Sequence, residues 1–382
     1  MIPNFDPADA LGTEWRSGRW LGRIDRGDGP SPILVVGGIA HDMARVAPTV
    51  AELVAGGIFD PAAGEVIGDL AALGLSPDGT PRLLSPIDFQ CVKAAGVTFA
   101  VSALERVIEE RARGDAGAAV AVRARLETRV GGGLAGVVPG SAEAAALKAA
   151  LIEEGLWSQY LEVAIGPDAE VFTKAAILST VGWGSAVGIR SDSTWNNPEP
   201  EVVLLVDPAG RTVGATLGND VNLRDFEGRS ALLLGKAKDN NASCALGAFV
   251  RLFDDDFTMD DVRRAAVTLR IEGADGYVLD GASAMDQISR DPDELVRQTL
   301  SEHQYPDGFV LFLGTLFAPT KDRDEPGGGF THKVGDTVAI ASPRLGRLVN
   351  GVTTSKAAPP WSFGVTALTR NLAARGLLAD RS

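Results

Sequence analysis

Residues 195–225 read WNNPEPEVVLLVDPAGRTVGATLGNDVNLRD, and this stretch decides the fold of the chain. Apolar residues at 202–206 predict a mostly buried strand, and the following DPAG at 207–210 is typical of a turn. A second strand over about 212–217 would return the chain and complete a hairpin. The stretch therefore predicts two paired strands with polar residues at one end.

Three carboxylates flank this hairpin. Glu199 and Glu201 are two residues apart, and residues i and i+2 of a strand share a face. The return strand would bring Asp220, nineteen positions after Glu201, to the same end of the sheet. Three converging anions raise each other's pKa unless a cation neutralises them, and all-oxygen ligands favour Mg²⁺, Mn²⁺ or Ca²⁺ over Zn²⁺. The spacing alone also fits an ordinary acidic strand edge, because ExE is a weak pattern.

The composition is that of a globular protein. The chain has 382 residues, 45% of them hydrophobic, and a net charge of −14, which argues against binding to nucleic acid. No apolar run approaches the ~20 residues of a membrane span, and MIPNFDPADALG lacks the order of a signal peptide. Only Cys91 and Cys244 are present, without partner spacing. We therefore expect a cytoplasmic protein with no membrane partner.

The first half of the chain divides at about residue 85. Residues 1–85 are expected to form a small N-terminal α/β domain, with strands at 21–24 and 33–36 and a helix at 48–57. Residues 86–382 would form the catalytic domain, opening with a strand at 89–92. The segment SALERVIEERARGDAG at 102–117 predicts a helix, with apolar positions 104, 107 and 108 on one face and charges elsewhere. Small residues follow at 114–140, so 100–140 is either a closing lid or a plain surface helix and loop.

The rest of the chain is expected to be mainly β after one further helix. Ser141 is a plausible N-cap for a helix over 141–154, and from residue 160 strands predominate, including 266–271, a buried run at 307–319 and a hairpin at 333–352. Helices are predicted to begin at Thr258, at Asp291 and at a capping Ser362. Strands with isolated helices and no βαβ rhythm predict an α+β, β-rich fold with a mixed or mainly antiparallel sheet.

Five segments in the same order resemble the fumarylacetoacetate hydrolase family through roughly residues 86–375. They are NNPEPEVVLLV (196–206), GNDVNLRDFEG (218–228), KDNNASCALG (238–247), DGFVLFLGT (307–315) and KVGDTVAIASPRLGRLVNGV (333–352). The resemblance implies a mixed β-sandwich rolled into a barrel-like sheet. It also implies Mg²⁺ held by Glu199, Glu201 and Asp220, with Mn²⁺ or Ca²⁺ as possible substitutes.

Within that family the chain is most similar to the 2-keto-3-deoxy-pentonate dehydratases, through CVKAAGVTFAVSALERVIEERARGDAG, GLWSQYLEVAIGPDAEVFTK, HQYPDGFVLFLGT and FTHKVGD. This likeness implies a hydro-lyase that converts 2-keto-3-deoxy-D-xylonate or D-arabinonate to 2-oxoglutarate semialdehyde. Hydrolases of the family carry a water-activating His where this chain has Ser102 in GVTFAVSALE. The alternatives are an acylpyruvate-type C–C bond hydrolase and a non-catalytic protein that retains the fold.

The likeness also suggests catalytic residues. Glu170 is the candidate acid/base that would move protons between C3 and the leaving C4 hydroxyl. Lys238 would hold the enolate oxygen or, with a depressed pKa, move a proton, and Lys236 is the competing lysine. Thr315 would orient a substrate oxygen or a water, or would be merely structural.

Weaker assignments concern substrate binding. Lys174 can bind the charged end of the substrate, and Ser102 and Glu105 on the presumed lid can touch it after closure. Arg224 is expected to pair with Asp225 and brace the turn that carries the metal ligand. The partner is a small keto sugar acid whose exact identity and C4 configuration stay open, and the family likeness implies a homodimer or homotetramer.

Overall fold

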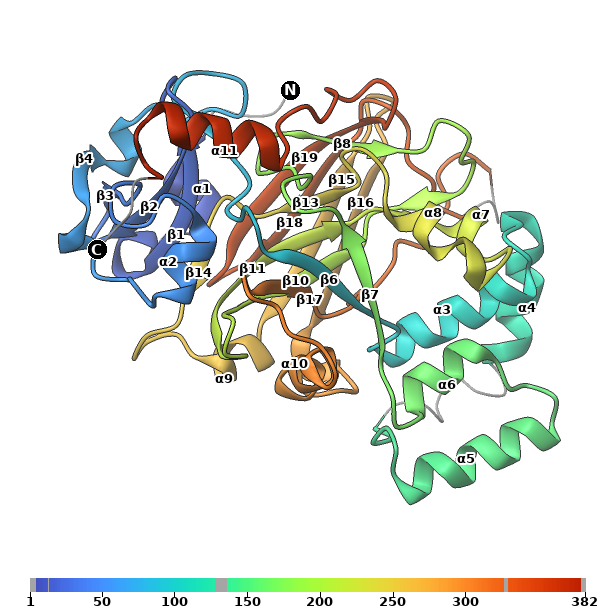
Figure 1. The fold of residues 1–382 in the computed structure, drawn as a ribbon. Helices are drawn as coiled ribbons and strands as arrows, with labels where there is room; N and C mark the ends of the chain where they lie inside the picture. The colour runs from blue at the N-terminus through green and yellow to red at the C-terminus, as the bar shows by residue number, and fades with distance from the viewer. Residues whose placement is uncertain (1–4, 13, 128–135, 326–328, 379–382) are drawn as a thin grey trace.

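The computed structural model describes residues 5–12, 14–127, 136–325 and 329–378. Two β-sheets fill the centre of the molecule and helices lie around them (Figure 1). In order across its width, the larger sheet contains β4 (Glu65–Asp69), β3 (Ile39–Asp42), β2 (Pro30–Val36), β1 (Arg19–Asp25), β14 (Val250–Leu252), β11 (Thr212–Asp220), β10 (Pro200–Val206), β17 (Phe309–Phe312), β6 (Cys91–Gly96) and β7 (Glu170–Ala175). Two short strands join its side, β13 (Cys244–Leu246) beside β11 and β5 (Arg82–Leu83) beside β1.

The second sheet has five strands, and a short two-stranded pair next to the β10–β11 hairpin is not hydrogen-bonded into either sheet. The five strands are β16 (Val278–Ala284), β15 (Ala266–Glu272), β18 (Thr337–Ser342), β19 (Gly346–Thr354) and β8 (Ala186–Ile189), and the pair is β9 (Asn196–Asn197) with β12 (Asn222–Leu223). The α-helices are α1 (Pro7–Leu11), α2 (Val50–Ala55), α3 (Ala100–Arg111), α4 (Ala116–Glu127), α5 (Ala142–Glu153), α6 (Gln159–Ile165), α7 (Arg224–Glu227), α8 (Leu234–Lys238), α9 (Met259–Arg263), α10 (Pro292–Leu300) and α11 (Val365–Ala374). Short 3₁₀ turns are η1 (Trp15–Ser17), η2 (Pro61–Ala63), η3 (Leu70–Ala72), η4 (Ala231–Leu233) and η5 (Met285–Gln287).

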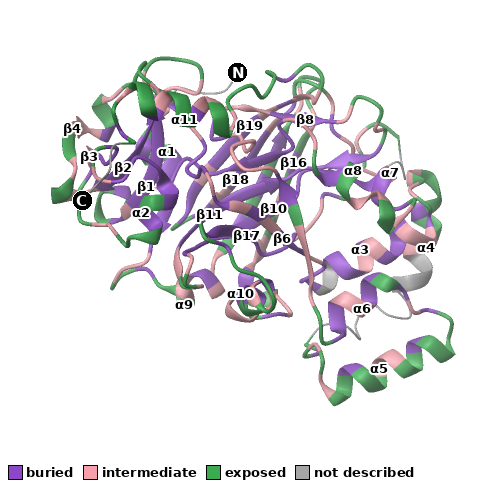
Figure 2. Cartoon of the chain, in the orientation of Figure 1, coloured by how far each residue is buried: buried purple, intermediate pink, exposed green. Residues whose placement is uncertain are grey.

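The β10–β11 hairpin confirms the expectation from the sequence and lies at the centre of the core. Every residue of β10 is buried (Figure 2). Its alternate side chains enter two different apolar clusters, with Val202 and Leu204 in one and Val203 and Leu205 in the other. Because both faces of the strand are covered, β10 has a continuous apolar run instead of a polar alternation. The position of the hairpin end is therefore fixed from both sides.

Several predicted boundaries are confirmed and others are wrong. Ser141 caps α5, and Thr258 begins α9 with a capping box. Ser362 does not cap the C-terminal helix, which begins at Val365 after Gly364. The small-residue tract at 114–140 contains the helix α4, because its alanines are strong helix formers, while residues 128–135 lie outside the described residues. Helix α6 likewise interrupts the region expected to be mainly β.

The N-terminal strands belong to the same sheet as the hairpin. Strand β1 pairs with β14, which in turn pairs with β11. Helix α11 covers this unit, and Leu368 and Leu372 form a cluster with Ala44. The sheet continues from this unit into the strands around the hairpin, so the boundary at residue 85 stays a prediction.

The fold class is confirmed as α+β, β-rich and mixed. Both strand orders end in edge strands that pair on one side, β4 and β7 in one sheet and β16 and β8 in the other, so the barrel-like sheet is not closed among the described strands. No helix in the described ranges combines the length and the apolar character needed to cross a bilayer.

A glycine in β11 has a steric role that can be tested. A Cβ at Gly218 would collide with the ring of Phe312 and come within 2.6 Å of Val203 Cγ2. We expect Gly218→Ala to lower the free energy of unfolding by about 1–3 kcal/mol, because the packed core must move. Urea unfolding measures this loss. Gly235→Ala is the control, since no atom lies within 4 Å of its added Cβ, and an equal loss in both variants would contradict the explanation.

Candidate active site

Three carboxylates, the carboxylate triad of Glu199, Glu201 and Asp220, meet at the end of the hairpin. Glu199 directly precedes β10, Glu201 is its second residue, and Asp220 ends β11. The Asp220 backbone N–H donates to the Glu199 carbonyl over 3.1 Å. All three are at most 3% exposed, and each offers an oxygen within 4.8 Å of the others. The convergence that the hairpin predicts is therefore present.

Two buried lysines contact the carboxylate triad. Lys238 Nζ lies 2.5 Å from Glu199 Oε2 and 3.2 Å from Asp220 Oδ2. Lys174 Nζ lies 2.9 Å from Asp220 Oδ1 and also donates to the backbone carbonyl of Lys238. Lys236 is exposed. Of the two competing lysines, Lys238 is therefore the one that enters the site.

Burial and neighbouring charges displace the pKa values of the site. Burial raises the pKa of Glu201 well above its ordinary value, and the charges of Asp220 and Glu199 raise it further. Burial acts in the same direction on Glu199, but Lys238 and Arg106 outweigh it and lower its pKa. Burial alone would lower the pKa of Lys238, yet Asp220 and Glu199 hold it above its ordinary value. In the metal-free site the pKa of Lys238 is therefore raised and the lysine carries its charge, while its role beside a bound metal stays a prediction.

The carboxylate triad fits a hard divalent cation such as Mg²⁺, which prefers oxygen ligands. Apart from the Glu105–Arg123 pair, six carboxylates and four basic side chains line the site or pair within it among the described residues. The carboxylates are Glu109, Glu170, Glu199, Glu201, Asp220 and Glu227, and the basic side chains are Arg106, Lys174, Arg224 and Lys238. Two formal negative charges remain if all these groups ionise, and a divalent cation held by the carboxylate triad would balance them.

Arg106 on α3 connects the carboxylate triad to further acidic groups. Its guanidinium lies 2.7 Å from Glu199 Oε1 and 2.8 Å from Glu109 Oε2, and it also pairs with Glu227. Arg106, Glu109 and Glu227 are absent from the residues that the sequence predicts for the site. Residues 102, 106 and 109 share one face of a helix, and this spacing is the signal that would have identified Arg106 and Glu109. The apolar positions Val107 and Ile108 are buried as expected, and the charged face of α3 meets the other charged groups of the site.

Ser102 and Glu105 lie on the same helix and reach the site in different ways. The Ser102 hydroxyl donates to the backbone carbonyl of Thr315. The Thr315 hydroxyl lies 3.4 Å from Glu201 Oε1, and the Gly314 N–H donates to Glu201 Oε2 over 2.8 Å. Glu105 pairs with Arg123 on α4. Helix α3 is thereby joined to the strand end that holds Glu201.

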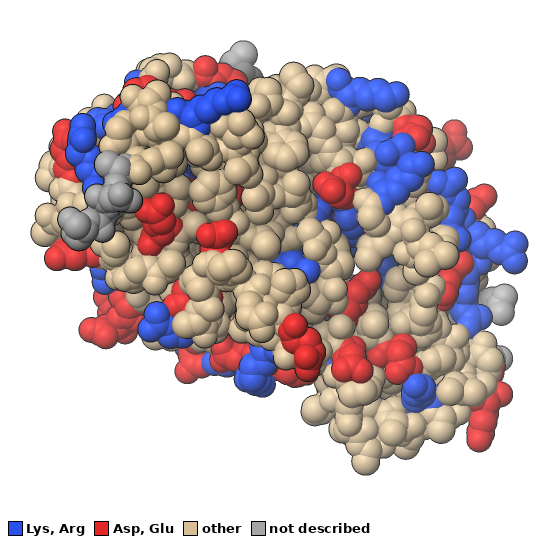
Figure 3. Space-filling view, in the orientation of Figure 1, with Lys and Arg blue, Asp and Glu red and all other residues tan. Residues whose placement is uncertain are grey.

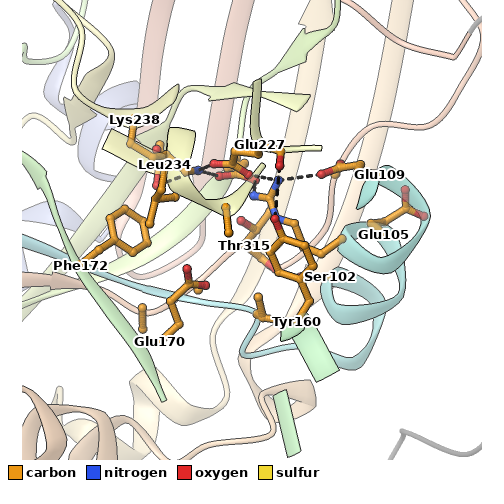
Figure 4. A pocket seen from close by; sticks show the side chains of 18 of the residues that line it. Ser102, Glu105, Glu109, Tyr160, Glu170, Phe172, Glu227, Leu234, Lys238 and Thr315 are labelled. Carbon is orange, nitrogen blue, oxygen red and sulfur yellow. Dashed lines mark hydrogen bonds and ion pairs between the residues drawn. The ribbon is translucent and has the colours of Figure 1, made fainter. Parts of the chain in front are cut away.

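The opposite wall of the pocket carries Glu170, at the start of β7, and Tyr160 on α6. In Figure 4 the Glu170 carboxyl group points toward the ion-pair network from below. Burial, followed by the charge of Glu227, raises its pKa above the ordinary value. A side chain at Gly96, the strand neighbour of Glu170, would collide with the Glu170 carboxyl group. The glycine therefore leaves the space that Glu170 occupies.

One pocket joins these walls. It encloses about 660 Å³ of atom-free space counted to its open mouth, and the centre of a water molecule can occupy about 40 Å³, so the space between the charged side chains is narrow. The pocket brings together Glu170, Lys238, Thr315, Ser102 and Glu105 with the carboxylate triad. Lys174 is fully buried behind Asp220 and is not among the described lining residues.

Arg224 does not make the contact that was expected. Its guanidinium lies 2.7 Å from Asn197 Oδ1 and 3.3 Å from Glu109 Oε1. Asp225 instead accepts from the Ser193 hydroxyl and the Thr194 N–H, both over 2.9 Å. The expected Arg224–Asp225 pair is therefore wrong, because α7 begins at Arg224 and its first residues point to different neighbours.

Curated relatives carry dehydratase names. A probable 2-keto-3-deoxyxylonate dehydratase of Haloferax volcanii is 33% identical over 202 residues, which are 53% of this chain and 66% of that protein. A 2-dehydro-3-deoxy-D-arabinonate dehydratase of Saccharolobus solfataricus is 30% identical over 186 residues, 48% of this chain and 58% of that protein. The matches thus span less than two thirds of either relative. No family model matches the chain.

Solved structures share the fold. A 2-keto-3-deoxy-D-arabinonate dehydratase complexed with magnesium and 2,5-dioxopentanoate has a TM-score of 0.61 at 22% identity, over 88% of this chain and 99% of that one. A fumarylacetoacetate hydrolase from Exiguobacterium antarcticum has a TM-score of 0.53 at 15% identity, with the same coverage. The resemblance predicted from the sequence motifs is confirmed: the chain has the fold of the fumarylacetoacetate hydrolase family, and its curated relatives are named as 2-keto-3-deoxy sugar acid dehydratases.

Proposed function

We propose that this protein is a Mg²⁺-dependent dehydratase that converts a 2-keto-3-deoxy-pentonate to 2,5-dioxopentanoate. The observation that carries the proposal is one pocket holding Glu170, Lys238 and the carboxylate triad, with no histidine among its described lining residues. The dehydratase names of the curated relatives support the same chemistry.

The substrate is an anion with a keto group next to its carboxylate. Arg106 and Lys238 are the two basic side chains among the described lining residues, and both have raised pKa values because acidic groups surround them. They remain charged at neutral pH and can hold the oxygens of the keto acid. Lys and Arg side chains also gather on the surface around α7 and α8 (Figure 3), which favours approach of an anion despite the net charge of −14.

The reaction removes one water and needs no external oxidant or reductant. A proton leaves C3 and the C4 hydroxyl departs as water, which gives a C3=C4 double bond. C5 then loses a C–H proton while C3 regains one, and the resulting C4=C5 enol passes its C5 hydroxyl proton to C4, which leaves an aldehyde at C5. Mg²⁺ bound by Glu199, Glu201 and Asp220 would supply Lewis acidity at the keto acid oxygens. Lys238 adds positive charge where the C2 oxygen becomes negative, which stabilises the product of C3 deprotonation.

Glu170 is the proposed acid/base. Its raised pKa brings the carboxyl group closer to neutral pH, where one group can both take and return a proton. It would take the C3 proton and return a proton to the leaving hydroxyl. Thr315 and Ser102 would orient substrate oxygens, and Glu105 would contact the substrate from α3. We propose that Lys174 positions Asp220 from behind and does not touch the substrate, since it is fully buried there.

Hydrolysis of an acylpyruvate remains the second candidate, because the fumarylacetoacetate hydrolase fold is shared. Hydrolases of the family activate water with a histidine. The described pocket wall at α3 instead presents Ser102, Glu105, Arg106 and Glu109. The dehydratase therefore fits the lining better. A cytoplasmic homodimer or homotetramer, Mn²⁺ or Ca²⁺ as substitutes, and a place in pentose oxidation are proposals that accompany this function.

Turnover of both C4 enantiomers of 2-keto-3-deoxypentonate, with Mg²⁺ and with EDTA, tests the proposed function. A semialdehyde dehydrogenase that reduces NADP reports the product. We expect metal-dependent semialdehyde and a loss of at least about 100-fold in Glu199→Gln, because that variant lacks one metal ligand. Release of pyruvate from an acylpyruvate, without semialdehyde from either enantiomer, would establish the hydrolase instead.

A further inference from the structure

Arg290 is a buried cation outside the pocket that the proposed mechanism does not use. It is 1% exposed and lies between η5 and the N-cap of α10. Burial lowers its pKa, and among the described residues its ion-pair partner is Glu294, which lies 3.3 Å away and is partly exposed. Desolvating a guanidinium is unfavourable unless specific contacts compensate, so its hydrogen bonds indicate its role.

Those hydrogen bonds go to a single turn of backbone. Arg290 Nη2 donates to the carbonyls of Val163 at 2.8 Å, Gly166 at 2.7 Å and Asp168 at 3.2 Å, and Nη1 donates to Pro167 at 3.3 Å. These carbonyls belong to the C-terminal end of α6 and the turn that leads to Glu170. The carbonyls at a helix end lack partners within the helix, and a cation there is favourable.

A neighbouring side chain continues the same contact. Gln298 on α10 accepts from the N–H of Ala169 over 2.7 Å and donates to the Pro167 carbonyl over 3.3 Å. Ala169 directly precedes Glu170. The backbone before the proposed acid/base is therefore held by two side chains of the α10 region, while strand pairing with Gly96 holds it from the other side.

The segment that carries Arg290 is also fixed to the other wall of the pocket. The Ser289 N–H and hydroxyl both donate to the Thr98 carbonyl over 2.8 Å. Phe99 bridges to Ile288 and is the N-cap of α3, the helix that carries Arg106. Residues 288–290 thus connect the start of α3 to the end of α6.

We infer that Arg290 is a positioning residue that sets the location of the Glu170 carboxyl group relative to the carboxylate triad. The inference rests on the proposed function, in which Glu170 moves protons. Arg290 touches neither substrate nor metal in this arrangement and acts through the backbone of residues 163–169. Misplacing a catalytic group by about 1 Å from outside the site can cost on the order of 100-fold in rate.

The test compares Arg290→Met with Arg263→Met. Arg263 is the matched control, because among the described residues its ion pairs are with Asp260, Asp291 and Asp293 beside Arg290 and not with residues 163–169. For Arg290→Met we expect kcat to fall by about 10- to 100-fold, with KM and the Kd for Mg²⁺ within about twofold of wild type. Arg263→Met should retain the wild-type kcat. Arg290→Lys should recover part of the lost kcat because its ammonium still donates to the turn, but only part because it reaches fewer carbonyls.

A titration separates this role from a purely structural one. The charged groups with the largest effects on the pKa of Glu170 are Glu227, Arg106, Lys238 and Glu199, Tyr160 also interacts with it, and the variant changes none of them. Loosening the turn should expose Glu170 to water, so its carboxyl resonance in ¹³C NMR, assigned with Glu170→Gln, should titrate at lower pH in Arg290→Met. If Arg290→Met does not fold, Gln298→Ala replaces it and should show the same changes at smaller size.

The inference is overturned if the folded variant keeps both its kcat and the titration of Glu170. It is also overturned if kcat, KM and Mg²⁺ affinity deteriorate together, since that pattern reports general loss of structure. Absence of dehydration by the wild-type protein is a failure of the proposed function, and the NMR titration then still decides the role of Arg290.

Discussion

Glu170→Gln should lower the rate of dehydration by at least about 100-fold while leaving the metal site intact, and this is the result we expect with the largest effect on kcat. The amide has the shape of the carboxyl group but can neither take nor return a proton. General acid–base catalysis contributes about 10²–10⁴-fold to a rate, so kcat should fall within that range. Mg²⁺ affinity measured by calorimetry should change little, because Glu170 is not part of the carboxylate triad.

The pH profile provides the second measurement on this variant. Burial and the charge of Glu227 raise the pKa of Glu170, so its reactive carboxylate accumulates only above the ordinary glutamate range. The wild-type kcat/KM should therefore rise with pH through this raised pKa, and the rise should disappear in Glu170→Gln.

Thr173→Val is the matched control for the strand that carries Glu170. Thr173 lies on β7 but is exposed and accepts a hydrogen bond from Lys93. It should keep the wild-type rate and pH profile. A residual rate in Glu170→Gln above one tenth of wild type would remove Glu170 from the role of acid/base and direct attention to other lining groups.

The hairpin and its carboxylates could be predicted because the signals are local. Residues 199–220 contain both strands, the turn and all three members of the carboxylate triad, and β-pairing of near neighbours converts spacing into proximity. Lys238 and Glu170 required the family likeness, since nothing in their own neighbourhoods distinguishes them from solvated side chains. Lys236 is only two residues from Lys238 and yet is exposed.

The residues that the sequence does not reveal act across distant segments. Arg106 reaches Glu199 from 93 positions away, and Arg290 reaches Gly166 from 124 positions away. On a helix with an apolar stripe, charged positions are normally assigned to solvent, and α3 reverses this because its charged face meets other charges inside a pocket. Such a face is recognisable only once the opposing residues are known.

Glu201→Gln should lose the metal and keep the fold. Burial and the charges of Asp220 and Glu199 raise the pKa of Glu201. In the metal-free protein the ionised Glu201 carboxylate is therefore unfavourable, because its two acidic neighbours repel it. The amide oxygen can still accept from the Gly314 N–H, which now donates over 2.8 Å to Glu201 Oε2. We expect Mg²⁺ affinity to fall by more than the roughly 10–100-fold that loss of a supporting partner costs. In EDTA, the variant should be at least as stable as wild type.

Thermal unfolding separates these two effects. At a Mg²⁺ concentration of about 100 times its Kd, wild type should gain about 2.7 kcal/mol of stability, and the variant should gain little at the same concentration. The raised pKa also fixes the direction in which the stability of the metal-free protein changes with pH. A carboxyl group whose pKa is higher folded than unfolded binds more protons when folded, so metal-free wild type should lose stability as pH rises above the ordinary glutamate pKa. Glu201→Gln should lack this part of the decline.

Glu272→Gln is the control, because Glu272 is an exposed carboxylate on β15 and lies outside the pocket. It should bind Mg²⁺ as wild type does. If Glu201→Gln kept the wild-type Mg²⁺ affinity, the metal would have to bind elsewhere. Protons would then have to neutralise the excess negative charge around the carboxylate triad. If the variant instead lost stability in EDTA, its carboxylate would be stabilising the metal-free fold, and the Gly314 and Thr315 contacts would then outweigh the repulsion within the triad.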